Sequence, residues 1–363
     1  NSKTETINYY SLTLAKGTTI SDVKSDGTST TSAVQYLSCY SIPIDATVGT
    51  DGTWVSWTKT SGTNLTTFTA GTKSQNVVMG AGAATLTANA IGKPVITRSD
   101  FNTFTYTAQG AAAYYVSTSS TAPTVGASQS TFALNKWTAA TNTGDLSLAE
   151  NTTYYVWAES SASGGTRSVA ANIAVIKITR NQGTGTTLTT RFDSTTETSG
   201  TAFTDSSKLV LNGTPFWAKA VANTGYNGIA LKHGSTSMTA TGATFNSSAS
   251  ETIVSTANAN TYTVTYNSNK PSNATTNVNG TTANSSHTYG IPKNLTANGY
   301  RLTGWKFEGW NSKSDGTGTN YTDQQSVSNL TSTNGATVIL YAIWTANTDI
   351  PYVVKHWQQK LTG

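Results

Sequence analysis

The residues that could carry catalytic or metal chemistry are few and lie far apart in the sequence. The three histidines, His233, His287 and His356, have no His-x-His, His-Glu-x-x-His or Cys-x-x-Cys neighbour, so no zinc site is indicated. No Gly-x-Ser-x-Gly nucleophile elbow is found, although a Ser-His-Asp triad stays open because its members come from separate segments. The paired carboxylates of glycoside cleavage need a cleft, which small stacked sheets rarely supply. The sequence therefore predicts no enzyme activity, no cofactor, and no catalytic, cofactor-binding or metal-binding residue.

Three Asp-Gly pairs allow either a calcium loop or a β-turn: Asp26-Gly27, Asp51-Gly52 and Asp315-Gly316. None of them continues as the Asp-x-Asp-x-Asp-Gly loop with a terminal Glu, so the sequence favours turns. Asn-x-Ser/Thr triplets also recur, and they would mark N-glycosylation in a eukaryotic secreted protein. In a bacterial protein rich in Asn, Ser and Thr they carry no signal, which is the expectation here. They begin at Asn64, Asn151, Asn212, Asn246, Asn273, Asn279, Asn284, Asn294, Asn320 and Asn329.

Four tryptophans, Trp54, Trp57, Trp305 and Trp310, fit either a carbohydrate-stacking platform or the core of small sheets. Small domains depend on aromatic burial, so the sequence favours the core. Lys177 lies in an apolar strand-like run and is the lysine to consider for an isopeptide bond, which needs a buried, neutral amine. A strand lysine more commonly points to solvent, and that interpretation is favoured.

Composition limits the class of protein. The 363 residues carry a net charge of +5, with only 11% charged residues, and Thr and Ser fill the gap. The 22 Lys and Arg residues are scattered, which argues against nucleic-acid binding. No apolar run is long enough to span a membrane. The single cysteine, Cys39, cannot form an internal disulfide, and we expect a small buried apolar residue there.

The elements that must position these residues are mainly strands, because Thr, Val, Ile, Tyr and Trp alternate with a period of two. Three segments share one layout, in which a glycine precedes an aromatic residue: Gly52, Gly225 and Gly304. We expect each of these glycines to adopt a positive φ angle. Each segment is also predicted to open with a strand, at 10–14, 173–179 and 262–266. Each is predicted to close with another, at 84–90, 251–257 and 337–344.

A fourth segment, residues 93–178, has short strands separated by Gly, Ser, Asn and Pro, which is typical of a sandwich. Tyr154 is a candidate for a tyrosine corner. One short helix per repeat is expected, for example at 324–330 or 33–37. We predict junctions near 91–94, 178–182, 258–262 and 345–350, and expect an elongated chain of tightly joined modules.

Residues 262–346 resemble the Listeria–Bacteroides repeat, also called the internalin B-repeat. The matching runs are Tyr262–Asn269, His287–Gly290, Gly304–Thr319 and Leu340–Thr345. That family implies a small β-grasp-like module of bacterial surface proteins. Residues 1–92 and 180–261 resemble divergent forms of the repeat, and residues 93–179 resemble a fibronectin type III or immunoglobulin-like sandwich. Residues 347–363 resemble a linker and the first strand of a truncated mucin-binding (MucBP) module, through Tyr352–Gln359. The unpaired strand there suggests a fragment cut early in its next module.

Together these resemblances imply a mainly β chain of tandem modules: three β-grasp-like repeats and one sandwich. They imply a non-enzymatic adhesin-like stalk, extracellular and on the surface of a Gram-positive or related bacterium, either secreted or attached to the cell wall. Three alternatives stay open. The chain could bind a glycan or mucin of a host or neighbouring cell, form a fibre by addition of edge strands between copies, or be an accessory region of a secreted hydrolase.

Overall fold

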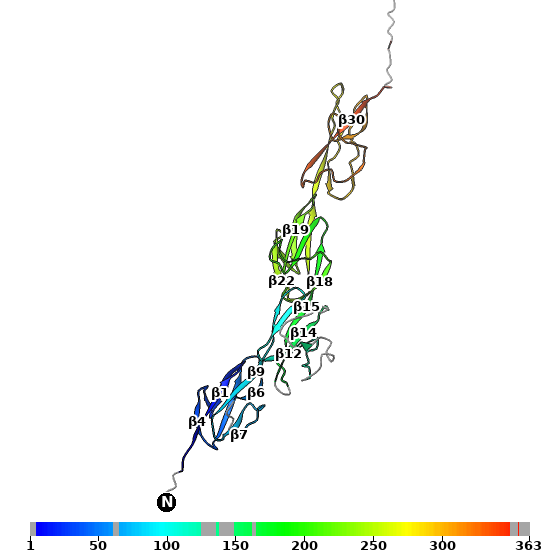
Figure 1. Cartoon of the computed structure of the whole chain (residues 1–363). Helices are drawn as coiled ribbons and strands as arrows, with labels where there is room; N and C mark the ends of the chain where they lie inside the picture. Colours follow the sequence, from blue (N-terminus) through cyan, green and yellow to red (C-terminus); the bar gives the residue numbers. More distant parts are fainter. Residues whose placement is uncertain are drawn as a thin grey trace, which may run out of the picture. The chain divides into compact units, whose positions relative to one another are not determined.

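The computed structural model describes residues 5–60, 65–124, 136–137, 149–161, 165–348 and 355. These residues form strands, turns and loops and contain no helix, so the prediction of a mainly β chain with separate sheets is confirmed (Figure 1). The short helices expected at 33–37 and 324–330 are wrong. Both segments hold strands instead, because pairing with distant strands outweighs their weak local helical preference.

Residues 1–92 contain two sheets, with strand orders β4-β1-β9-β6 and β3-β2-β5-β8-β7. The strands are β1 (Tyr9–Lys16), β2 (Ile20–Ser25), β3 (Thr28–Ser29), β4 (Val34–Leu37), β5 (Ser41–Val48), β6 (Gly52–Thr60), β7 (Leu65–Thr67), β8 (Gln75–Met79) and β9 (Ala84–Gly92).

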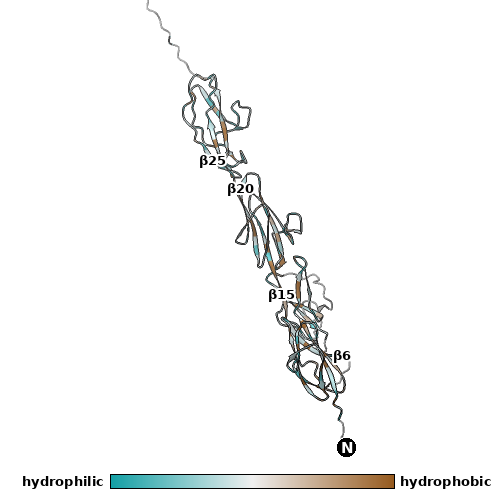
Figure 2. Cartoon of the chain, turned by 90° about the vertical axis from the view of Figure 1, so that its left-hand side faces the viewer, coloured by the Kyte–Doolittle hydropathy of each residue, from teal (hydrophilic) through white to brown (hydrophobic). Residues whose placement is uncertain are grey.

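The predicted period of two appears directly in the burial of these strands. In β9, Ala84, Leu86 and Ala88 are buried while the threonines between them are only half-buried. Side chains from both sheets, among them Leu14 and Ile42, meet these residues in one core. Figure 2 shows hydrophobic residues concentrated on the strands.

Residues 93–179 contain β10 (Val95–Arg98), β11 (Phe104–Thr107), β12 (Ala111–Ser117), β13 (Lys136–Trp137), β14 (Thr153–Ser160) and the start of β15 (Ala171–Gln182). Antiparallel pairs join β10 to β11, β12 to β13 and β14, and β14 to β15. Tyr154 is buried, and burial raises the pKa of its hydroxyl. Leu148, which belongs to the predicted tyrosine-corner run, lies outside the described residues, so that corner stays a prediction.

Residues 180–261 contain β16 (Thr186–Phe192), β17 (Thr201–Ala202), β18 (Ser207–Leu211), β19 (Pro215–Ala222), β20 (Tyr226–His233), β21 (Thr236–Met238), β22 (Ala243–Asn246) and β23 (Glu251–Ala259). β18 pairs with β15, β17 with β16, and β20 with both β21 and β23, all antiparallel.

The chain divides into two compact units. The first comprises Asn1–Thr179, Arg191–Trp217 and Thr244–Glu251, and the second comprises Arg180–Thr190, Ala218–Ala243 and Thr252–Gly363. β15, β16, β19, β22 and β23 contribute residues to both units. The predicted junction at 178–182 therefore falls within the continuous strand β15.

Residues 262–346 contain a sheet with the order β25-β24-β30-β27-β28 and a two-stranded sheet of β26 and β29. The strands are β24 (Thr261–Asn267), β25 (Ser285–Thr288), β26 (Lys293–Asn294), β27 (Trp305–Asn311), β28 (Asn320–Tyr321), β29 (Ser326–Val327) and β30 (Thr337–Ala346).

This sheet repeats the strand order of the first one. β24 pairs in parallel with β30, as β1 does with β9, while β27 and β6 each run antiparallel to that last strand. Both β6 and β27 contain a bulge, at Val55 and at Glu308 respectively, three residues after the strand begins. The two segments are thus internal repeats in structure as well as in sequence layout. No described helix is long and apolar enough to cross a bilayer.

Candidate functional site

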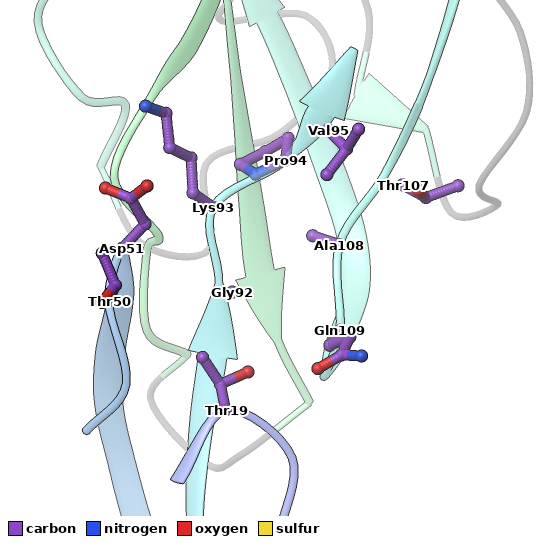
Figure 3. Close-up of a pocket in the computed structure, with 10 residues that line it drawn as sticks. All are labelled: Thr19, Thr50, Asp51, Gly92, Lys93, Pro94, Val95, Thr107, Ala108 and Gln109. Atoms are coloured by element: carbon purple, nitrogen blue, oxygen red, sulfur yellow. The ribbon is translucent and has the colours of Figure 1, made fainter. Parts of the chain in front are cut away.

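A cavity of about 680 Å³ lies in the first unit, at the boundary between the predicted modules 1–92 and 93–179 (Figure 3). Turns that follow or precede strands of both modules build it. Its walls are Thr19, Thr50, Asp51, Gly92, Lys93, Pro94, Val95, Thr107, Ala108 and Gln109. Figure 3 shows Thr50, Asp51 and Lys93 on one side, with Thr107 and Gln109 on the other.

Two of these residues have an unusual backbone conformation. Thr19, in the turn between β1 and β2, has φ 63°, and Asp51, just before β6, has φ 60°. A positive φ is rare for any residue with a side chain and is a clear outlier for a β-branched residue such as threonine. Conformations of this kind persist where surrounding contacts enforce them, and they are concentrated at functional sites.

The cavity wall combines apolar surface with polar groups that include both donors and acceptors. Thr19 Oγ1 is buried and has no hydrogen-bond partner among the described residues. Asp51 and Gln109 are exposed, and they add a carboxylate and an amide. Pro94 and the 63% exposed Val95 supply a short aliphatic surface. This combination suits a polar ligand with some apolar surface.

Main-chain hydrogen bonds connect the turns that build the cavity. The Lys93 N–H donates to the Asp51 carbonyl at 3.0 Å, and the Gly92 N–H donates to the Gln109 carbonyl at 2.9 Å. We call the first of these a closing bond. Its donor is the residue that follows the last strand of a repeat, and its acceptor lies in the turn before the strand that runs antiparallel to that last strand, which is β6 in the first repeat. Ile91, next in sequence, is fully buried in the core that includes Phe104.

The closing bond recurs in the second unit. The Asn260 N–H donates to the Gly225 carbonyl at 2.8 Å, and the Asn347 N–H donates to the Gly304 carbonyl at 2.9 Å. In each case the donor follows the last strand of a repeat and the acceptor precedes the strand that pairs with it. Three repeats therefore end with the same main-chain contact.

Asn260 is also held by its side chain. It is 6% exposed, accepts a hydrogen bond from Asn227 Nδ2 at 2.6 Å, and donates to the Ser332 carbonyl at 2.6 Å. Its own carbonyl accepts from the Tyr289 N–H at 2.8 Å. Residues on both sides of this junction are therefore fixed to one buried asparagine.

The tryptophans that the sequence singled out lie mainly in cores. Trp57 and Trp310 are 1% and 0% exposed, so the core interpretation is confirmed for both. Trp54 is half-buried and meets Trp57 edge to face, with ring centroids 5.7 Å apart. Trp305 is half-buried as well.

The expectation that Cys39 is buried is wrong. Its thiol is free and exposed, and the residue has φ 62° in the turn after β4. Its N–H donates to the Met79 carbonyl at 2.7 Å, so the main chain is fixed while the side chain points outward. The sequence around Cys39 does not indicate whether its side chain faces the core or the solvent at this turn.

The Asp-Gly pairs form turns, as predicted. Asp26 and Gly27 both have positive φ between β2 and β3, the pattern of a type I′ hairpin. Asp315 Oδ1 accepts hydrogen bonds from the Thr317 N–H and hydroxyl, and these bonds lower the pKa of that carboxyl. Among the described residues, no three His, Cys, Asp or Glu side chains come together as metal ligands.

The remaining candidates lie apart from the cavity. Lys177 is 40% exposed at its side chain and pairs with Glu150 at 3.3 Å, so it lacks the burial that an isopeptide bond requires. His287 is buried, stacks on Tyr262 and shares a hydrogen bond of 2.8 Å with Ser285 Oγ. His356 lies outside the described residues, as do Asn64 and residues 352–354 and 356–359 of the predicted mucin-binding strand.

Sequence reasoning missed most of the cavity. Asp51 was noted only as part of a turn, and Thr19, Lys93 and Gln109 carried no motif, because the cavity forms from four turns that are distant in sequence. Comparison of the chain with protein-family models, with curated proteins and with solved structures finds no match.

Proposed function

We propose that this chain is a non-enzymatic structural segment of an extracellular bacterial surface protein, in which tandem β modules act as a semi-rigid spacer. The observation that carries the proposal is the closing bond, which recurs at Lys93, Asn260 and Asn347. A linker of Gly and Ser would leave neighbouring modules free to move. Repeats that end in the same short main-chain contact instead restrict the direction in which the next module can begin.

The junction at Asn260 supports the proposal in most detail. Only this residue separates β23 from β24, and its main chain and side chain bond to residues on both sides. Tyr226 and Tyr289 add an edge-to-face contact across it, with ring centroids 5.9 Å apart. Such a junction suits a spacer better than a hinge.

The sequence resemblance to internalin B-repeats supports the surface location. Weak charge and abundant Thr fit strands whose outer faces are polar without being charged. Both are arguments from the sequence, so location needs its own test. Antibodies raised against residues 262–346 should label intact cells, and labelling only after permeabilisation would refute an extracellular role.

Stiffness is tested by spin labels at two exposed serines, Ser237 and Ser314, in a Cys39→Ser background that removes the exposed thiol. We expect a narrow distance distribution. Asn260→Pro removes the N–H of the closing bond and should broaden it, whereas Asn260→Ala keeps that N–H and should broaden it less. A distribution that is already broad without these substitutions would contradict the spacer.

A further inference from the structure

Two junctions of the chain share the same main-chain hydrogen bonds but carry different side chains at equivalent positions. In the first repeat, the Gly49 N–H donates to the Thr19 carbonyl at 2.8 Å. In the second, at residues 180–261, the Asn223 N–H donates to the Gly185 carbonyl at 2.9 Å. Thr19 and Gly185 therefore occupy the same position, and both have positive φ. The closing bonds likewise make Asp51 equivalent to Gly225.

At the junction of the second and third repeats, two tyrosine rings cover these glycines. A Cβ atom at Gly185 would lie 2.5 Å from Cε1 of Tyr226, and a Cβ atom at Gly225 would lie 2.5 Å from Cγ of Tyr289. The glycines are required there because the rings occupy the space that side chains would need. The rings close the junction between residues 180–261 and 262–346.

Strand register shows what replaces the two rings in the first repeat. Gly52 pairs with Gly92 in the way that Tyr226 pairs with Ala259, so Gly52 stands at the position of Tyr226.

The second ring is replaced in the same way. The closing bonds make Lys93 equivalent to Asn260. The register of Val95 with Thr107 puts Gln109 opposite Lys93, and the register of Thr261 with Thr288 puts Tyr289 opposite Asn260, so Gln109 stands at the position of Tyr289. Gln109 lines the cavity, and Gly52 follows the lining residue Asp51 and pairs with the lining residue Gly92. The cavity of Figure 3 thus occupies the space that two aromatic rings fill in the other junction.

Polar side chains appear where the other junction has glycine. Thr19 and Asp51 adopt positive φ angles that glycine adopts without strain at Gly185 and Gly225. Their presence places a hydroxyl and a carboxylate at the edge of the open space. Thr19 Oγ1 is also left buried without a partner among the described residues, which is unfavourable.

We propose that this cavity is a binding site for one pyranose residue of a glycan. The space matches a ring-shaped group, because rings fill its counterpart. Its wall offers hydroxyl, carboxylate, amide and ammonium groups, which can pair with the donors and acceptors of sugar hydroxyls. Pro94 and Val95 provide the aliphatic surface for the C–H face of the ring. An aromatic side chain of a peptide would leave most of these polar groups unpaired, so a sugar is the better match.

The proposal is tested by filling the cavity with an aromatic ring. The full chain, fluorescently labelled, is applied to a glycan array, and the best glycan is then titrated by calorimetry. Ala108→Tyr adds a ring to the wall of the cavity and should weaken binding at least about tenfold. The matched control is Ala112→Tyr, the same substitution at an exposed site four residues away, which should leave affinity unchanged.

A second variant protects the test against misfolding. Gln109→Ala removes an exposed amide from the wall without adding volume, and should weaken binding about fivefold or more with an unchanged melting temperature. Absence of binding to every glycan, or equal binding by Ala108→Tyr and Ala112→Tyr when both are folded, would overturn the proposal. Binding of Tyr- or Trp-containing peptides in place of glycans would overturn the assignment to a sugar.

Discussion

A methyl group at Gly225 should weaken the junction that Asn260 forms, and the size of the effect can be derived from two terms. Gly225 has φ 83°, a left-handed conformation that an L-residue adopts at a cost of about 1–2 kcal/mol. The new Cβ would also overlap the Tyr289 ring, and forced repacking of this kind costs about 1–3 kcal/mol. Gly225→Ala should therefore destabilise the junction by about 2–5 kcal/mol.

Tyr289→Ala separates the two terms. Without the ring, the overlap disappears while the φ penalty remains, so Gly225→Ala should cost only about 1–2 kcal/mol in the Tyr289→Ala background. The difference is a coupling energy of about 1–3 kcal/mol, within the range measured for residues in contact. Tyr226→Ala in place of Tyr289→Ala is the comparison, because Tyr226 covers Gly185, whereas the atoms nearest the new methyl group, outside its neighbours in sequence, belong to Tyr289.

Hydrogen exchange in the full chain is the suitable assay, since a chain of several modules has no single free energy of unfolding. The reporter amides are Asn260, which donates to Gly225, and Tyr289, which donates to Asn260. Gly225→Ala should speed their exchange by a factor corresponding to the predicted free energy. A change below about 0.5 kcal/mol, or one equally large without the Tyr289 ring, would refute the packing argument.

Three further outcomes are expected. Thr19→Gly removes a strained φ and an unpartnered hydroxyl, so hydrogen exchange at the first junction should slow by about 1 kcal/mol, and faster exchange would contradict this. Trp57→Ala should cost about 3–5 kcal/mol, measured by faster hydrogen exchange in β6 and β9, whereas Trp54→Ala should cost less than half as much because that ring is only half-buried. Burial, with a smaller contribution from the charge of Lys293, lowers the pKa of His287, so its repeat should lose stability as the pH falls below about 6.5. That loss approaches 1.4 kcal/mol per pH unit at most, and His287→Phe should abolish it in acid titrations followed by hydrogen exchange.

The strands were predictable because their signal is local. Alternation over a few residues indicated the opening and closing strands of all three repeats, and the structure confirms β1, β15 and β24 as well as β9, β23 and β30. Burial of one face produces this alternation wherever a strand covers a core, so a single sequence is sufficient to see it. The parallel pairing of opening with closing strands depends on contacts about seventy residues apart, and no local pattern reports it.

The turns show where prediction from the local sequence failed. The sequence placed a positive φ at Gly52, by analogy with Gly225 and Gly304, but the residue with that conformation is Asp51. The layout of Gly followed by an aromatic is therefore shifted by one position in the first repeat. Glycine is the usual residue at positive φ, and an aspartate can substitute because its short side chain tolerates this region. Only the register of Gly52 with Gly92 makes the shift visible.

That shift bears on function more than on fold. If the first junction served only as a spacer, glycine at positions 19 and 51 and tyrosine at 52 and 109 would give a tighter and less strained contact, as the junction at Asn260 shows. Strain, an unpartnered hydroxyl and an open cavity are each unfavourable, and here they are found together at one junction. Departures from the locally stable choice that coincide in this way are typical of binding sites. The closing bond is kept at the same time, so the junction retains its connection while its side chains are free to recognise a ligand.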